Sequence, residues 1–127
     1  MEAFFAKYQA KLESNSFILP NHMDCRVWGG ARYASGYGQI RVAWPLGTFI
    51  TRKHEKVHRL AWMCFHKQIA PHYDAFDQVL HVSHLCHNRL CIHPTHLVLE
   101  TKHINEERKH CKLQRLCVGT HNPLCIF

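Results

Sequence analysis

The chain has 127 residues and a formal net charge of +7 with its histidines neutral, on a sequence pI of about 9.2. This length suits one domain with a modest core, to which bound metal ions would add needed stability. The positive charge favours a polyanionic partner, and no apolar run has the length of a membrane span or a signal peptide. We therefore expect neither a membrane-spanning protein nor a secretory leader.

Seven cysteines and thirteen histidines are the most informative part of the composition. An odd number of cysteines cannot all pair, and their mixture with histidines at short intervals is typical of metal sites rather than of a disulfide framework. Zinc thiolates persist in a reducing compartment, so we expect an intracellular protein.

The N-terminal part predicts a helix that leads into a loop. Phe4, Phe5, Tyr8 and Leu12 recur at helical spacing, which indicates an amphipathic helix packed on the domain; a partner-binding helix is the alternative. Residues 13–25, rich in turn-forming residues, predict a loop that delivers Cys25 as a zinc ligand or as a buried free thiol.

Residues 37–52 predict a β-hairpin. Alternating residues from Tyr37 to Trp44 lead to a turn at 45–47 and then to a second strand at 48–52. Its apolar face would cover the core. On the other face Gln39 and Arg41 are suited to reading adenine and guanine edges in a DNA major groove, or they lie on an ordinary solvated surface.

A helix is predicted over residues 55–67, entered by a basic cluster. The cluster consists of Arg52, Lys53, Lys56 and Arg59. Contact with phosphates and plain solvation are both open for these residues. Further along, Cys64 shares an apolar face with Val57, Leu60, Ala61 and Phe65, which indicates a small buried hydrophobic residue.

Three potential metal ligands follow at equal intervals. Cys86, Cys91 and His96 are each separated by four residues, and Pro94 interrupts the loop between them. This spacing allows one tetrahedral Zn²⁺ to bind all three side chains. With Cys25 as fourth ligand the zinc is structural; with water in that position it is the open site of a zinc hydrolase.

The segments around this loop predict a strand, the metal loop, a second strand and a helix. Residues 78–82 and 97–100 suit the two strands, and Thr101 suits the N-cap of a helix over 102–109. His84 then ends the first strand and Asn105 lies one turn into the helix. Both side chains can face the same small volume.

These residues together resemble a known family. The matching positions are Ser83-His84-Leu85-Cys86-His87-Asn88, then Cys91, Pro94, His96-Leu97 and Asn105. They look like the core of the His-Cys box homing endonucleases, within the wider ββα-metal (His-Me finger) nucleases. The resemblance implies an α+β fold, a small zinc-stapled domain with an antiparallel hairpin or sheet and few helices. It extends to a second zinc site, which would consist of Cys111, Cys117, His121 and Cys125.

The resemblance also implies a chemistry. His84 would be the general base that takes a proton from the attacking water, and Asn105 would hold one Mg²⁺. The products of double-stranded DNA cleavage would carry 5′-phosphate and 3′-hydroxyl ends. His81, His87 and His93 are alternatives as base or metal ligand. The arginine that such nucleases place near the scissile phosphate would be Arg41, Arg52 or Arg59.

Boundaries and partners follow from the same resemblance. We expect a single domain over 1–127, with a helix and loop at 1–24, a DNA-reading part at 25–80, the catalytic core at 81–110 and a zinc loop at 111–127. Double-stranded DNA is the expected partner and the nucleus the expected location. The chain ends at Phe127 without the tail that the best-known member exchanges between subunits, so we do not expect dimerisation by that route. A homodimer formed in another way and a monomer that nicks DNA are both open. A zinc-stabilised module that binds nucleic acid without cleaving it is the alternative function.

Overall fold

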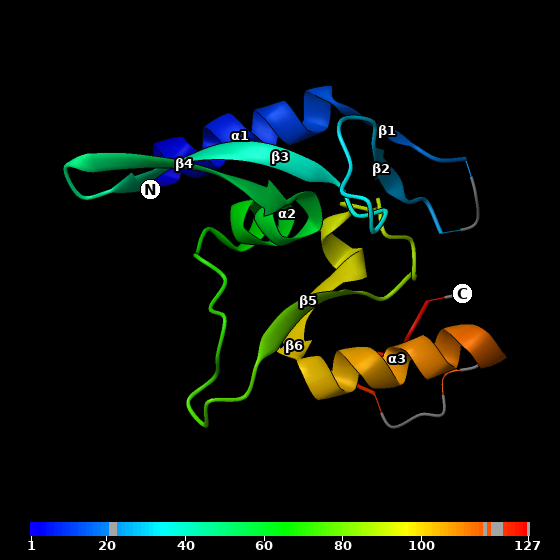
Figure 1. Ribbon diagram of the computed structural model, residues 1–127. Helices are drawn as coiled ribbons and strands as arrows, with labels where there is room; N and C mark the ends of the chain where they lie inside the picture. Colours follow the sequence, from blue (N-terminus) through cyan, green and yellow to red (C-terminus); the bar gives the residue numbers. More distant parts are fainter. Residues whose placement is uncertain (21–22, 116, 118–120, 127) are drawn as a thin grey trace.

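The computed structural model describes residues 1–20, 23–115, 117 and 121–126. Three helices and three antiparallel strand pairs occur in the described residues, and the strands lie in runs between the helices, which confirms the predicted α+β class. The elements are α1 (Glu2–Ser14), β1 (Ser16–Ile18), β2 (Arg26–Trp28), β3 (Gln39–Leu46), β4 (Phe49–Lys56), α2 (Val57–His66), β5 (Leu80–His84), the 3₁₀ turn η1 (Pro94–His96), β6 (Leu97–Thr101) and α3 (Lys102–Gln114). Figure 1 shows α1 beside the β3–β4 hairpin and α3 at the opposite end, with α2 and β5–β6 between them.

Among the described residues the strands form three antiparallel pairs, β1–β2, β3–β4 and β5–β6. The β3–β4 hairpin runs from the pair Gln39 and Lys56 to the turn at Gly47, whose φ of 61° is in the left-handed region that glycine tolerates. Ile40, Val42 and Trp44 alternate along β3 and are buried, as predicted.

The main core lies between α1, the hairpin and α2. The apolar stripe of α1 is buried as predicted, and its Tyr8 hydroxyl accepts a hydrogen bond from the Ala43 backbone N–H at 2.8 Å. Gly38 permits the closest approach in this core, because a Cβ there would lie 2.8 Å from Trp28 Cδ1 and 2.9 Å from Val57 Cγ2. The absence of a side chain at Gly38 therefore lets the chain enter β3 in close contact with Trp28 of β2 and with Val57 at the start of α2.

The unit that carries the site is β5, η1, β6 and α3. The β5–β6 ladder pairs His84 with Leu97 at one end and Leu80 with Thr101 at the other. Thr101 then caps α3, as predicted, by accepting a hydrogen bond from the Ile104 N–H at 3.4 Å. A ladder followed directly by a capped helix fixes α3 relative to β5.

Four expectations about this architecture need correction. The predicted loop at 13–25 contains β1, which pairs with β2; residues 21 and 22 of that loop lie outside the described part. The helix predicted over 55–67 begins later, because β4 continues to Lys56. The last helix runs on to Gln114. Phe65 is 53% exposed rather than buried beside Cys64, because it lies on the outer face of α2.

Within the part of the chain that the structure describes, no helix combines the length and apolar character needed to cross a membrane.

Candidate functional site

The first candidate metal centre joins three distant segments. Cys25 precedes β2, Cys86 and Cys91 lie in the loop after β5, and His96 ends η1. One ligand atom from each lies within 4.8 Å of all the others, and all four residues are buried. His96 Nδ1 is 3.4 Å from Cys91 Sγ and 3.7 Å from Cys25 Sγ. Tetrahedral zinc with ordinary bond lengths separates such atoms by about 3.6 Å, so this set fits Zn²⁺.

The thiols of this cluster need a cation to ionise together. Burial raises the pKa of Cys25 to about 11, and the hydrogen bond with Cys91, together with burial, raises the pKa of Cys86. The same hydrogen bond from Cys86 lowers the pKa of Cys91 to about 5. One thiolate is therefore favoured at the expense of its neighbours. A bound divalent ion supplies the charge that allows all three sulfurs to be ligands.

The second candidate metal centre lies at the end of α3. Cys111 is in its last turn, and Cys117, His121 and Cys125 follow it; ligand atoms of the four lie within 4.8 Å of one another. His121 Nδ1 is 3.5 Å from the sulfurs of Cys111 and Cys117 and 4.0 Å from that of Cys125. Its Nε2 lies 3.2 Å from a Glu107 oxygen, a contact that orients metal-binding imidazoles. Both predicted ligand sets therefore meet in space.

Arg108 joins this second centre to the β5–β6 sheet. It is 1% exposed, and its Nε and Nη2 lie 2.6 and 2.9 Å from the two carboxylate oxygens of Glu100 on β6. Its Nη1 donates to Cys125 Sγ at 3.4 Å. Arg108→Met is expected to lower the free energy of unfolding by about 3–5 kcal/mol, because the Glu100 carboxylate stays buried without its partner. Urea unfolding of the zinc-loaded protein measures this loss.

The double variant Arg108→Met/Glu100→Gln tests whether the unpaired Glu100 carboxylate causes this loss of stability. It should recover much of the lost stability, since no unpaired charge remains buried. The exposed Arg32→Met variant is the matched control. A loss for Arg108→Met no larger than that of the control would show that the pair does not hold α3 on the sheet.

His84 is held in one tautomer by the metal loop. Its Nε2 lies 3.0 Å from the Cys91 carbonyl oxygen. A carbonyl only accepts, so Nε2 carries the proton and Nδ1 keeps its lone pair. Burial lowers the pKa of His84 to about 4, so the ring is neutral near pH 7. A neutral imidazole with an available Nδ1 can accept a proton from water.

Two further rings surround His84. The His58 ring on α2 is 4.5 Å from the His84 ring, centroid to centroid, and Tyr37 lies 5.2 Å from His58. Burial lowers the pKa of His58 well below its usual range, and its Nδ1 has no hydrogen-bond partner among the described residues. Sequence reasoning assigned His58 no role. The available signal is a histidine in the first turn of a helix whose later residues are mostly apolar.

Two clefts meet at Asn105. The larger, about 690 Å³, is lined by His58, His81 and Asn105 together with Lys56, Arg59 and Lys109. The smaller, about 300 Å³, is lined by His84 and Asn105 together with Tyr37, His87, Arg89 and Arg108. His84 and Asn105 thus border one volume, as the strand–loop–strand–helix pattern predicted.

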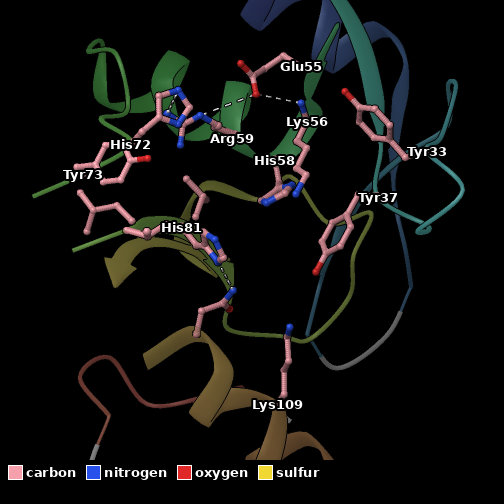
Figure 2. Close-up of a pocket in the computed structure, with 14 residues that line it drawn as sticks. Tyr33, Tyr37, Glu55, Lys56, His58, Arg59, His72, Tyr73, His81 and Lys109 are labelled. Atoms are coloured by element: carbon pink, nitrogen blue, oxygen red, sulfur yellow. Dashed lines mark hydrogen bonds and ion pairs between the residues drawn. The ribbon is translucent and has the colours of Figure 1, made fainter. Parts of the chain in front are cut away.

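Asn105 contacts His81 across the larger cleft, with 3.1 Å between Asn105 Nδ2 and His81 Nδ1. Burial, aided by Lys56, Lys102 and Lys109, lowers the pKa of His81. Figure 2 shows Lys109 reaching into this cleft from α3, opposite Lys56 and His58. Lys109 was also missed from the sequence, although it follows Asn105 by four residues and so shares its helical face.

The other candidate histidines have different surroundings. His93 Nδ1 accepts a hydrogen bond from the Thr95 N–H at 3.2 Å and so caps η1, and its ring stacks on that of His96. His87 is half-buried and borders the smaller cleft. Neither His87 nor His93 is shown with the contact that His84 makes, in which the Cys91 carbonyl accepts a hydrogen bond from the ring Nε2.

The candidate DNA-contacting residues fall into two groups. Arg41, Arg52 and Lys53 are exposed on the hairpin, and Gln39 is half-buried beside them. Arg59 is buried instead. Its guanidinium donates to the Ala70 carbonyl and lies 3.8 Å from a Glu55 carboxylate oxygen. Figure 2 shows this Glu55–Arg59 pair along the wall of the larger cleft. Arg59 therefore holds the segment after α2 in place.

A family model described as the zinc-binding loop region of homing endonuclease matches residues 29–126. No curated protein and no solved structure matches the chain.

Proposed function

Because this chain belongs to the family described as the zinc-binding loop region of homing endonuclease, we propose that it is a Mg²⁺-dependent endonuclease that hydrolyses phosphodiester bonds of double-stranded DNA. The match confirms the resemblance to the His-Cys box homing endonucleases. The observation that carries the proposal is that His84, with its Nε2 fixed by the Cys91 carbonyl, and Asn105 border one cleft.

His84 is the proposed general base. Its Nδ1 takes a proton from the water that attacks the scissile phosphorus, while Nε2 keeps its hydrogen bond to Cys91 and so holds the ring in place. The arriving phosphate raises the pKa of a buried imidazole toward neutrality, where proton transfer is most effective.

Asn105 is the proposed ligand of one Mg²⁺. An amide oxygen is a hard, neutral ligand, so water and phosphate oxygens of the substrate would have to supply the remaining ligands. When bound there, the ion would supply positive charge beside the phosphate and the leaving 3′ oxygen, and the products would carry 5′-phosphate and 3′-hydroxyl ends. Both zinc ions are structural, since each set of four protein ligands is complete.

Positive side chains would guide the DNA to the site. Lys56 and Lys109 border the larger cleft and suit phosphate contacts, while Arg41, Arg52 and Lys53 extend along the exposed hairpin. With Gln39 and Arg41 in the major groove, the hairpin would read bases. DNA as substrate implies action in a DNA-containing compartment, such as the nucleus.

Incubation of the zinc-loaded protein with supercoiled plasmid, with and without Mg²⁺, tests the proposal. We expect nicked or linear DNA only with Mg²⁺, with ends that DNA ligase rejoins, as 5′-phosphate and 3′-hydroxyl groups require. A random-sequence duplex library treated in parallel would reveal the recognition sequence. Duplex binding without cleavage at any Mg²⁺ concentration would contradict the proposal and favour a binding module.

Asn105→Ala is expected to lower the cleavage rate at fixed Mg²⁺ by about 10²–10³-fold, because it removes the protein ligand of an ion that stabilises transition-state charge. Timed plasmid nicking measures the rate. Glu106→Gln, at the exposed neighbouring position on α3, is the matched control. Equal rates for the two variants would remove Asn105 from the site.

A further inference from the structure

His81 on β5 and Asn105 on α3 share a hydrogen bond, with 3.1 Å between His81 Nδ1 and Asn105 Nδ2. An amide nitrogen has hydrogens to donate and does not accept, so His81 Nδ1 is the acceptor. In a neutral ring the proton then sits on Nε2. The contact therefore determines which end of the Asn105 amide faces β5.

The backbone holds the two residues in a fixed relation. The ladder pairs Leu80, next to His81, with Thr101, and Thr101 is the residue that caps α3. The Lys102 N–H also donates to the Val79 carbonyl at 2.8 Å. Asn105 lies one helical turn beyond this junction. The contact thus depends on a strand register and a helix cap, and both side chains are short.

A metal-binding asparagine has an orientation problem that a carboxylate does not have. Its oxygen and nitrogen ends have nearly the same shape, and only the oxygen binds a cation. Rotation of the amide by half a turn places an NH₂ group where the ion must lie. A neighbour that accepts from the nitrogen end favours the productive orientation.

Asn105 borders both clefts, whereas His81 borders the larger one and His84 the smaller one. We propose that His81 is a positioning residue: it accepts the hydrogen bond from Asn105 Nδ2 and so turns Asn105 Oδ1 toward the cleft of His84, where that oxygen binds the divalent cation. This inference rests on the proposed function.

Two substitutions of His81 distinguish the effect of its hydrogen-bond acceptor from the effect of the rest of its ring. His81→Asn keeps an acceptor, because its Oδ1 is two bonds beyond Cβ, as Nδ1 is in histidine. In His81→Leu the side chain also branches at Cγ, but it carries no atom that can accept a hydrogen bond. His110→Leu, on the exposed side of α3, is the matched control. Each variant is loaded with zinc, and the Mg²⁺ concentration for half-maximal plasmid nicking is measured beside the rate at saturating Mg²⁺.

We expect His81→Leu to need about tenfold more Mg²⁺, the factor that one ordinary hydrogen bond provides, with little change in the saturating rate. His81→Asn should keep the Mg²⁺ concentration for half-maximal nicking within about threefold of the wild-type value. A wild-type requirement in His81→Leu, or a fall confined to its saturating rate, would overturn the positioning role.

A second readout needs neither Mg²⁺ nor DNA. Nitrogen-15 NMR of the zinc-loaded protein reports the tautomer of His81 and the side-chain amide of Asn105. We expect an Nε2–H tautomer, and an Asn105 amide signal that moves in His81→Leu and not in His110→Leu. An Nδ1–H tautomer would overturn the inference even if the enzyme cuts DNA. A wild-type protein that shows the expected tautomer and cuts no plasmid would overturn the proposed function instead.

Discussion

Plasmid cleavage is expected to fall by about 10²–10⁴-fold when His84 is replaced by alanine, the range that loss of a general base produces. The reason lies in the two nitrogens of the ring. Nε2 donates to the Cys91 carbonyl, which leaves Nδ1 as the proton acceptor next to the cleft that Asn105 borders. Alanine removes both, and water alone is a much weaker base. Timed nicking at saturating Mg²⁺ measures the loss.

A second variant separates the base from the structural contact. His84→Gln can keep an N–H donor near the position of Nε2 and so preserve the contact with Cys91, but it has no proton acceptor of useful strength. It should therefore lose as much activity as alanine while it keeps two zinc ions and the wild-type unfolding midpoint. Substantial cleavage by His84→Gln would show that another group, such as His87, takes the proton.

The metal centres illustrate what short-range pattern can predict. The four-residue intervals among Cys86, Cys91 and His96 are set by the reach of a loop around one ion, so they are visible in the sequence. Among the residues that the structure describes, one further sulfur, that of Cys25, joins this cluster. Helical spacing in α1 and alternation along β3 were equally readable, because each reflects one buried face.

Features that depend on tertiary contacts were not readable. β1 is only three residues long, too short for a strand pattern to be visible in the sequence, and it forms because β2 pairs with it while Val27 bridges to Cys91. The position of His58 beside His84 could not be predicted, because it depends on the packing of α2 against β5. The contact of Arg59 with the Ala70 carbonyl could not be predicted, because Ala70 lies beyond the end of the helix; phosphate contact by Arg59, which also lines the larger cleft, stays a prediction.

Cys25→Ala is expected to unfold much of the protein. Structural zinc supplies apparent binding free energies of about 10–16 kcal/mol in small zinc domains, as large as the whole stability of an ordinary domain. Here Cys25 ties β2 to the metal loop, where the Ile92 N–H donates to the Arg26 carbonyl at 2.7 Å and the Trp28 N–H to the Leu90 carbonyl at 2.9 Å. Without the fourth ligand, the zinc ion no longer holds β2 in the position where these two hydrogen bonds form. Zinc content and the thermal unfolding midpoint measure the outcome.

Cys64→Ala is the matched control for this loss. Cys64 is also buried, burial raises the pKa of its thiol to about 11, and it belongs to neither ligand set, so its replacement should leave two zinc ions and cost about 1 kcal/mol. Cys117→Ala should release the other zinc and loosen the end of α3, with β5, β6 and the first metal centre intact. A folded Cys25→Ala protein with two zinc ions would contradict a closed first site. Water would then occupy the fourth position, as in a zinc hydrolase.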